Sequence, residues 1–408
     1  MIYLFIVILL LFMILRYDYF RNERGREMSF WIIYVLLVLV AGLRYRLGQD
    51  TAVYIRYYEN LQPISQISIS AINSSRFAPG FTLIASAFRQ FTSEFVYFQL
   101  FHSIIVNTVF LLFLKRHTKH LFFSILLFFF FLYFNLLFQQ MRESLAASVF
   151  LLAWPAFTHR NWILWYIAAI FAMMFHVSSV FMLLLPLINL PIIKNFFIYT
   201  KFTPLICVGF IILGFLIQAY LFKYIQLIAF TEAMMERATT YSHSDLARAS
   251  FNILGLIGKA FQWIVYPLLA LIFLFSKKFR TENRDNTRLR QLEKMAILSI
   301  YISSLCISIP ILGRYNNYFY IFSIILMSQW VFTSLIVHGK KIRMEFASWM
   351  IFFLPMFFFQ VNNTYIGAVN RSGTLKGYMV YYPYSSYLDK TMDEDREKTM
   401  RYLIRTIK

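Results

Sequence analysis

The sequence predicts an all-α protein that crosses a membrane many times, and three observations support this prediction. Of its 408 residues, 60% are apolar and 20% aromatic, whereas only 14% are charged. A soluble domain usually has charge on about a quarter of its residues, so this chain has too little charge to cover a surface exposed to water. The apolar residues also form repeated runs of roughly 15 to 25 residues, which is the length of a membrane-spanning helix.

The apolar runs predict about twelve membrane helices. In chain order we expect them at 1–15, 29–43, 95–114, 121–138, 143–157, 162–174, 176–190, 203–222, 251–275, 295–310, 316–336 and 346–360. Residues 80–91, introduced by Ala78-Pro79-Gly80, are too few to cross alone and predict a re-entrant or interfacial helix. The first apolar run has no basic segment before it and no small-residue cleavage site after it, so we expect a retained helix.

The chain divides into two expected parts. Residues 1–360 form the transmembrane body, which includes two outer loops at 44–79 and 223–250. Residues 361–408 form a tail in which charges alternate with apolar residues at helical spacing from Met400 to Ile407. This spacing predicts an amphipathic surface helix at the end of the tail.

The net charge of +20 is explained by membrane topology and does not indicate nucleic-acid binding. Basic residues cluster in four connecting segments, at 16–26, 115–119, 277–294 and 340–343. All four lie on one side of the membrane if the stretch 162–190 is a pair of helices broken near His176. Because Lys and Arg are enriched on the cytoplasmic side, that side is predicted to be the cytoplasm. The basic tail is assigned to the outer side by the same count.

With this topology, polar residues that interrupt apolar sequence gather at the outer face. They come from five segments that are far apart in sequence, and they are Arg44, Arg46, Asp50, Tyr54, Gln139, Arg142, Glu143, His176, Arg314, Tyr382 and Tyr384. Charged groups at membrane depth are usually retained in a protein cavity for function. We therefore expect a polar site at the outer rim.

Arginine is the informative residue type in this set. Its planar fork stays charged and binds phosphate with two hydrogen bonds, so several arginines at a membrane cavity indicate a phosphate or pyrophosphate head group. The candidates are Arg44, Arg46, Arg142 and Arg314. The alternative is that these arginines reach toward anionic lipid or pair with nearby acids.

Three residues are candidates for a general base that activates a hydroxyl. A neutral imidazole can take a proton from a hydroxyl, which makes His176 a candidate, but a lone histidine is also commonly a hydrogen-bonded core residue. Asp50 follows a flexible glycine, and its alternative role is an ion pair with Arg46. Glu143 is the third, and beside Arg142 it has the alternative role of orienting the guanidinium.

Sugar contacts are expected from Tyr54, Gln139, Tyr382 and Tyr384. Other chemistry is mostly excluded by the sequence, which has no glycine-rich phosphate loop and no His or Cys pair at metal-binding spacing. Cys207 and Cys306 both lie in apolar segments and are interpreted as packing residues. We therefore expect no metal and no cofactor.

The string GLRYRLGQDTAVY at Gly42–Tyr54 resembles the Gly-x-Arg-x-x-x-Gly-x-Asp-x-x-x-Tyr signature of the EpsG family of Wzy-like polymerases. Further matching segments follow in the same order along nearly the whole chain: APGF at 78–81, MRESLAASVFLLA at 141–153, FHVSSVFMLLLP at 175–186, RYNNYF at 314–319 and YPYSSYL at 382–388.

The resemblance implies a metal-independent glycosyltransferase of the bacterial inner membrane, similar to the GT-C class in architecture, with its site facing the periplasm. Such enzymes take a glycan donor and acceptor, both carried on undecaprenyl pyrophosphate, and polymerise the repeat units of O-antigen, capsule or exopolysaccharide. A chain-length regulator and a flippase stay open as protein partners. Two alternative functions also stay open, an O-antigen ligase with the same donor, and a polysaccharide flippase or transporter.

Overall fold

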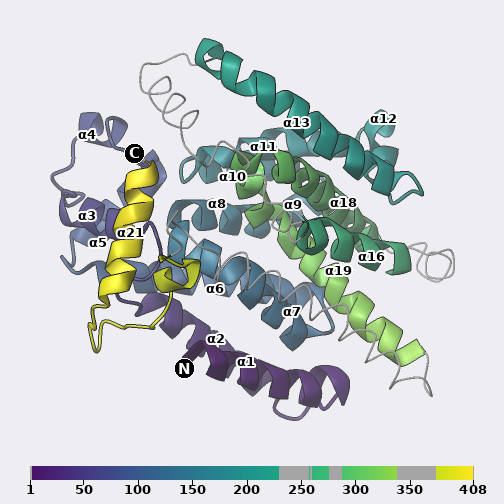
Figure 1. Cartoon of the computed structure of the whole chain (residues 1–408), viewed down its shortest axis with the longest axis horizontal. Helices are drawn as coiled ribbons and strands as arrows, with labels where there is room; N and C mark the ends of the chain where they lie inside the picture. The colour runs from purple at the N-terminus through teal and green to yellow at the C-terminus, as the bar shows by residue number, and fades with distance from the viewer. Residues whose placement is uncertain (1, 229–256, 258–259, 275–286, 338–373, 408) are drawn as a thin grey trace. The chain divides into compact units, whose positions relative to one another are not determined.

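The computed structural model describes residues 2–228, 257, 260–274, 287–337 and 374–407. Within these ranges the chain is helical and contains no β-strand, only an isolated bridge between Arg44 and Ser386 (Figure 1). This confirms the predicted all-α class. Some predicted segments lie outside the described residues. They are the helix at 346–360, the beginning of the helix at 251–275 and most of the outer loop 223–250.

The chain forms two compact units. The first comprises Met1–Leu190 and Val380–Glu397, and the second Pro191–Met379 and Lys398–Lys408. The beginning of the C-terminal helix α21 (Glu394–Ile407) therefore belongs to the first unit and its remainder to the second.

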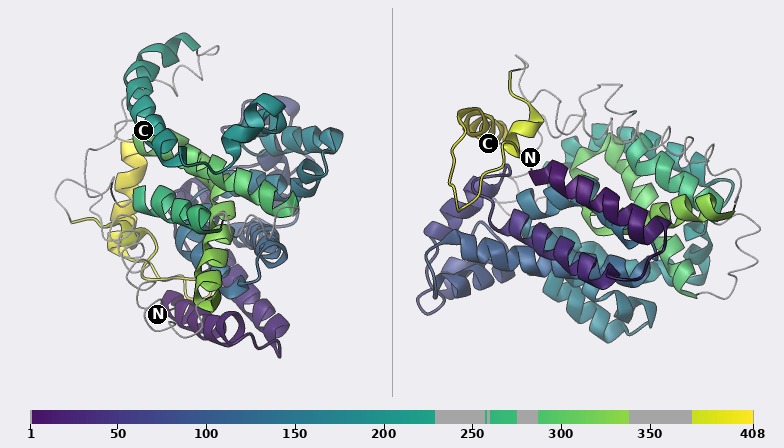
Figure 2. Two further views of the ribbon diagram at one scale, coloured as in Figure 1. Left: turned by 90° about the vertical axis from the view of Figure 1, so that its right-hand side faces the viewer. Right: turned by 90° about the horizontal axis from the view of Figure 1, so that it is seen from below.

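The first unit contains the following elements in chain order, where η marks a π or 3-10 helix: α1 (Ile2–Met13), η1 (Ile14–Tyr19), α2 (Arg26–Gly42), α3 (Thr51–Glu59), α4 (Ile69–Asn73), α5 (Pro79–Arg89), α6 (Phe95–His117), α7 (Leu121–Phe128), η2 (Phe129–Tyr133), η3 (Asn135–Gln139), α8 (Met141–Leu152), α9 (Trp154–Thr158), α10 (Trp162–Met173), η4 (Val177–Val180), α11 (Phe181–Leu184) and η5 (Leu185–Asn189). Neighbouring helices pack in pairs, α2 on α6, α6 on α8, α8 on α10 and α1 on α7. Figure 2 shows α1 and α2 side by side.

The second unit contains α12 (Pro191–Lys194), η6 (Asn195–Phe197), α13 (Thr203–Ile228), η7 (Phe261–Val265), α16 (Tyr266–Leu274), α18 (Thr287–Ser308), η8 (Pro310–Tyr315), α19 (Asn316–Val337) and all of η10 (Gly377–Val380) except its last residue. Its α18 packs against both α13 and α19.

Helices of the first unit alternate in direction, so their connecting segments collect at two ends. One end, which we call the basic end, holds residues 16–27 and 115–121, and there Arg26 donates a hydrogen bond of 2.6 Å to the Lys119 carbonyl. The other, which we call the motif end, holds residues 43–51, 138–142 and 380–389, and there the Thr51 hydroxyl lies 3.2 Å from the Phe138 carbonyl. The predicted topology likewise puts the first two basic segments on one side and the signature string on the other.

The predicted break near His176 is confirmed. Helix α10 ends at Met173, and His176 begins the 3-10 turn η4. The Trp165 indole N–H donates to the Met182 carbonyl at 2.8 Å, although the two residues are 17 positions apart. This contact requires the chain to fold back on itself after α10. The predicted short helix at 80–91 is also present, as α5 with Pro79 in its first turn.

Among the described residues, two helices are long and apolar enough to cross a membrane, Ile2–Tyr19 and Phe95–His117. A third is added if the bent pair Val177–Asn189 and Pro191–Phe197 counts as one span. The predicted twelve spans are not confirmed by this criterion. The physical reason is length, because the apolar helices Leu121–Tyr133 and Trp162–Met173 are shorter than a span and Ala153 separates α8 from α9.

Candidate functional site

Two glycines set the path of the motif loop, residues 43–51, between α2 and α3. A Cβ on Gly42 would lie 2.5 Å from the Leu100 side chain of α6. Gly48 has φ +98°, and a Cβ there would lie 2.0 Å from the carbonyl oxygen of Phe138. Only glycine permits both this backbone angle and this approach. The loop therefore rests directly on α6 and on the end of η3.

Arg44 lies entirely inside the first unit, with 0% of its surface exposed. Its Nε–H donates to the Leu47 carbonyl at 3.3 Å, another of its nitrogens donates to the Ala41 carbonyl, and the guanidinium carbon lies 4.9 Å from the centre of the Phe138 ring. Burial lowers the pKa of Arg44 to about 10, with tyrosine oxygens opposing the shift, so the group stays charged at neutral pH. These contacts brace the loop from within.

Arg46 binds a carboxylate through two of its nitrogens. Its Nε and Nη2 donate to the two oxygens of Glu397 at 2.8 and 2.9 Å. Hydrogen bonding to Glu397 is the largest cause of the pKa shift of Arg46, and it raises this pKa above the ordinary value. A parallel pair of such bonds is the geometry with which arginine also holds phosphate. Arg46 thus fastens the start of α21 to the motif loop.

The tail segment 380–389 packs along the motif loop. Three backbone hydrogen bonds join them, in which the N–H groups of Tyr45, Gly48 and Tyr387 donate to the carbonyls of Ser385, Val380 and Leu43 at 2.8, 3.1 and 2.8 Å. The buried Arg396 holds the turn of the tail by donating to the Pro383 and Thr391 carbonyls, both at 2.9 Å. The tail and the motif loop therefore share one end of the first unit, as the predicted topology requires.

The predicted sugar-contacting residues of this region differ in exposure. Tyr382 is 50% exposed, whereas the Tyr384 hydroxyl donates to the Val40 carbonyl at 3.1 Å. Burial raises the pKa of Tyr384 to about 12. Gln139 is partly exposed and donates a hydrogen bond to the Tyr381 hydroxyl. Tyr382 is thus the more exposed of these two predicted tail tyrosines.

Arg142, Tyr54 and Asp50 form a cluster beside the motif loop. The Arg142 guanidinium lies 4.3 Å from the centre of the Phe77 ring, and Tyr54 packs against the same ring at 5.4 Å. Burial raises the pKa of Tyr54; the nearby charge of Arg142 opposes the shift and that of Asp50 adds to it. Arg142 and Asp50 thus both lie near the Tyr54 hydroxyl. Arg142 is partly exposed, and its Nε has no hydrogen-bond partner among the described residues.

His176 lies at the turn that follows α10. It is 7% exposed, and its Nδ1 accepts the backbone N–H of Ser178 at 3.2 Å. Because Nδ1 is an acceptor, the neutral ring carries its proton on Nε2. The Gly80 N–H donates to the Met174 carbonyl at 2.7 Å, which fixes α5 against this turn, and η4 packs on α8, the helix that carries Arg142.

Two further candidates complete the predicted set. Glu143 is 2% exposed and lies in the first turn of α8, where a carboxylate is favoured by the helix dipole. Arg314 lies in η8 of the second unit and is partly exposed. The first unit therefore contains all the predicted site residues except Arg314. The electrostatic contacts described above place Arg142, Tyr54 and Asp50 beside one another, and His176 lies at a turn that packs on α5 and α8.

Two polar residues of α6 support the loop and were not predicted from the sequence. Gln99 donates to the carbonyls of Gly42 and Arg44 at 2.8 and 2.9 Å. The His102 Nε2 lies 2.7 Å from the Ser144 hydroxyl at the start of α8. The signal for them is a row of polar residues on one face of an otherwise apolar helix. In the part of the chain that the structure describes, no group of three His, Cys, Asp or Glu side chains is placed to hold a metal ion.

Comparison with known protein families matches residues 27–386 to the EpsG family. No curated protein and no solved structure matches the chain. The matched range contains the motif loop, Arg142, His176 and the tail tyrosines described above. Since the match spans most of its length, this protein belongs to the EpsG family, a family of Wzy-like polysaccharide polymerases.

Proposed function

We propose that this protein polymerises lipid-linked oligosaccharide repeat units at the periplasmic face of the inner membrane. The growing glycan is transferred from undecaprenyl pyrophosphate to the nonreducing sugar of an incoming lipid-linked unit. Family membership supports the class of reaction. The observation that carries the site is the cluster at the motif end, where Arg142 lies partly exposed beside Tyr54 and Asp50.

The reaction makes one bond and breaks another. An acceptor hydroxyl attacks the anomeric carbon of the donor, the bond from that carbon to the pyrophosphate oxygen breaks, and the oxygen leaves with the electron pair. The hydroxyl proton passes to a base. Negative charge grows on the leaving pyrophosphate, so fixed positive charge aimed at that oxygen lowers the barrier.

Arg142 is proposed as the main contact to the pyrophosphate. Arg142 as a whole is partly exposed. Its Nε–H group is buried and donates to no hydrogen-bond acceptor among the described residues. Arg44 is fully buried and bonded to backbone carbonyls, which supports a positioning role for it. Arg46 holds the Glu397 carboxylate, so a phosphate at Arg46 would have to displace that carboxylate. Arg314 stays a proposed contact to the second pyrophosphate.

Asp50 is proposed as the base that accepts the hydroxyl proton. Asp50 is partly exposed. Its negative charge raises the pKa of the Tyr54 hydroxyl, and the positive charge of Arg142 lowers the pKa of the same hydroxyl. Glu143 is nearly fully buried, which makes it a less accessible base. His176, with its proton on Nε2, is suited to donate a hydrogen bond to a phosphate or sugar oxygen.

The test is a gel of surface polysaccharide from a deletion strain that is complemented with variants at matched membrane levels. We expect Arg142→Ala to give products with a single repeat unit, while Arg56→Ala keeps the full ladder. Arg56 is an exposed arginine on α3 and makes a charge-matched control. A full ladder with Arg142→Ala would overturn the site assignment. Loss of all attached glycan in the deletion strain would indicate a ligase or a transporter, and an unchanged ladder in it would overturn the proposed polymerase function.

A further inference from the structure

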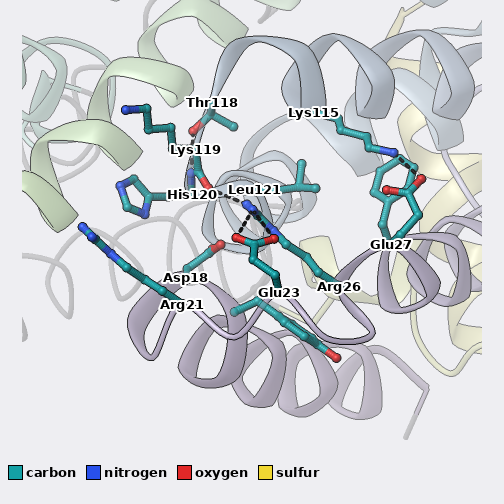
Figure 3. A pocket seen from close by; sticks show the side chains of 12 residues that line it. Asp18, Arg21, Glu23, Arg26, Glu27, Lys115, Thr118, Lys119, His120 and Leu121 are labelled. Carbon is teal, nitrogen blue, oxygen red and sulfur yellow. Dashed lines mark hydrogen bonds and ion pairs between the residues drawn. The ribbon is translucent and has the colours of Figure 1, made fainter.

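A pocket of ≈ 660 Å³ lies at the basic end of the first unit, at the opposite helix ends from the motif loop (Figure 3). Its walls come from the η1–α2 connection on one side and the α6–α7 connection on the other. This volume is within the range of small-ligand sites, about 300 to 1,000 Å³. None of these residues belongs to the site proposed for glycosyl transfer.

Four basic side chains line the pocket, and two of them are neutralised by acids of the same pocket. Arg26 pairs with Glu23 at 3.0 Å, and Lys115 pairs with Glu27 at 2.5 Å. These pairs fix the rim, because the Arg26 guanidinium also donates to a carbonyl of the opposite connection. Their charges are therefore already compensated.

The other two basic side chains, Arg21 and Lys119, form no ion pair and no side-chain hydrogen bond among the described residues. Figure 3 shows them near His120, which lies between them. Burial, together with the positive charges of Arg21, Arg26 and Lys119, lowers the pKa of His120 to about 4. The imidazole is therefore neutral at pH 7, and this part of the pocket has uncompensated positive charge.

Asp18 supplies an acceptor at the inner wall of the pocket. It is 2% exposed, and its Oδ2 accepts the Phe123 N–H at 2.8 Å. Its Oδ1 is buried and has no hydrogen-bond partner among the described residues. A buried acceptor without a partner is unfavourable, and a ligand with an N–H or O–H group would satisfy it.

We propose that this pocket binds a phosphate ester that also carries a hydrogen-bond donor, which is the chemistry of an ethanolamine or glycerol phospholipid head group. Arg21 and Lys119 bind the phosphate oxygens, and Asp18 accepts a hydrogen bond from the ammonium or hydroxyl group. Basic pockets between helices on the cytoplasmic side of a membrane commonly take lipid head groups. The predicted topology puts the basic end on that side.

The test measures binding of short-chain lipids to the purified full-length protein by native mass spectrometry. The probes are phosphatidylethanolamine, phosphatidylglycerol, phosphatidylcholine and inorganic phosphate. Phosphatidylcholine has the same phosphate but no N–H or O–H in its head group. We expect the first two lipids to bind wild type about tenfold more tightly than phosphatidylcholine, as one additional charge-assisted hydrogen bond predicts.

Variants separate the two parts of the pocket. Arg21→Ala with Lys119→Ala should weaken lipid binding by about tenfold or more. The control, Arg24→Ala with Arg160→Ala, removes the same charge from exposed positions outside the pocket and should leave binding unchanged. Asp18→Asn keeps an acceptor for the Phe123 N–H and should remove the preference over phosphatidylcholine.

Equal losses in the pocket variant and the control variant would overturn the proposal, because they would show binding by overall charge alone. Unchanged binding in the pocket variant would overturn it as well. If inorganic phosphate binds as tightly as the lipids and with the same dependence on Arg21 and Lys119, the ligand is a free phosphate and the lipid assignment is wrong. These readouts do not depend on polymerase activity, so they stand or fall separately from the proposed function.

Discussion

Replacing Gly48 by alanine tests how closely the motif loop depends on its contact with η3. The new Cβ would lie 2.0 Å from the Phe138 carbonyl oxygen and 2.8 Å from its carbonyl carbon. Both atoms belong to the backbone, so neither can rotate away. The loop or the end of η3 must move, and the Thr51 hydroxyl then loses its contact to the Phe138 carbonyl.

Two terms give the expected magnitude. An alanine at φ +98° is strained by about 1–2 kcal/mol, and forcing extra volume into a packed site costs about 1–3 kcal/mol. The free energy of unfolding should therefore fall by about 2–5 kcal/mol. Gly25→Ala isolates the first term, because its φ is +81° and its nearest atom, the Tyr17 hydroxyl, is an ordinary 3.4 Å away. Gly209→Ala has neither term, because no atom lies within 4 Å.

The assay is thermal unfolding of the three variants in detergent, with the polysaccharide ladder measured in cells at matched protein levels. We expect Gly48→Ala to be the least stable variant and to shorten the ladder, because the loop that carries Arg46 and Asp50 shifts. Gly25→Ala should lose only about 1–2 kcal/mol and keep the ladder. Equal stability of Gly48→Ala and Gly25→Ala would refute the close contact described here.

Three further predictions concern the Arg46–Glu397 pair, Arg142 and His120. The double variant Arg46→Glu with Glu397→Arg exchanges the two partners of this ion pair. In thermal unfolding it should regain the stability that either single variant loses. A full polysaccharide ladder in the double variant would show that Arg46 does not contact pyrophosphate. Arg142→Lys keeps the charge but not the two-pronged donor geometry, so we expect roughly tenfold slower polymer formation in a membrane assay, and a wild-type rate would contradict this role. The pKa of His120 is about 4 in the folded protein against an ordinary 6.5, so the folded state binds fewer protons between these values. The contribution of His120 to stability, measured as the difference between wild type and His120→Gln, should be complete above pH 6.5 and fall by up to about 3 kcal/mol as the pH drops toward 4.

Local features of the fold followed from the sequence where a physical signal was strong. The apolar run at 95–114 became α6, Phe95–His117, and Pro79 began α5 as expected from its fixed φ. The break before His176 was inferred from charge distribution alone, and the chain reverses there. The number of spans did not follow, because the apolar run 121–138 does not reveal that the apolar helix within it covers only Leu121–Tyr133.

The sequence allowed candidate site residues to be chosen, but it did not predict the contacts that these residues make. The spacing from Gly42 to Tyr54 indicated a functional loop, but nothing in it showed that Arg44 would be fully buried. The pairing of Arg46 with Glu397 joins residues 351 positions apart, and single-sequence reasoning has no access to such contacts. Gln99 was missed for a different reason, since the row of polar residues on one face of α6 does not by itself show that it supports the motif loop.

The position of the tail has a consequence for the order in which this protein is made. Residues 380–397 pack with the first 190 residues, while the stretch between them forms the second unit. The motif loop therefore leaves the ribosome long before the tail segment 380–389, to which it hydrogen-bonds, has been synthesised. Until then the N–H of Tyr45 and the guanidinium of Arg46 lack their native partners. The candidate site is thus completed only after residues 191–379 have been synthesised, so a chain that ends before residue 380 does not present an assembled site to lipid-linked substrates.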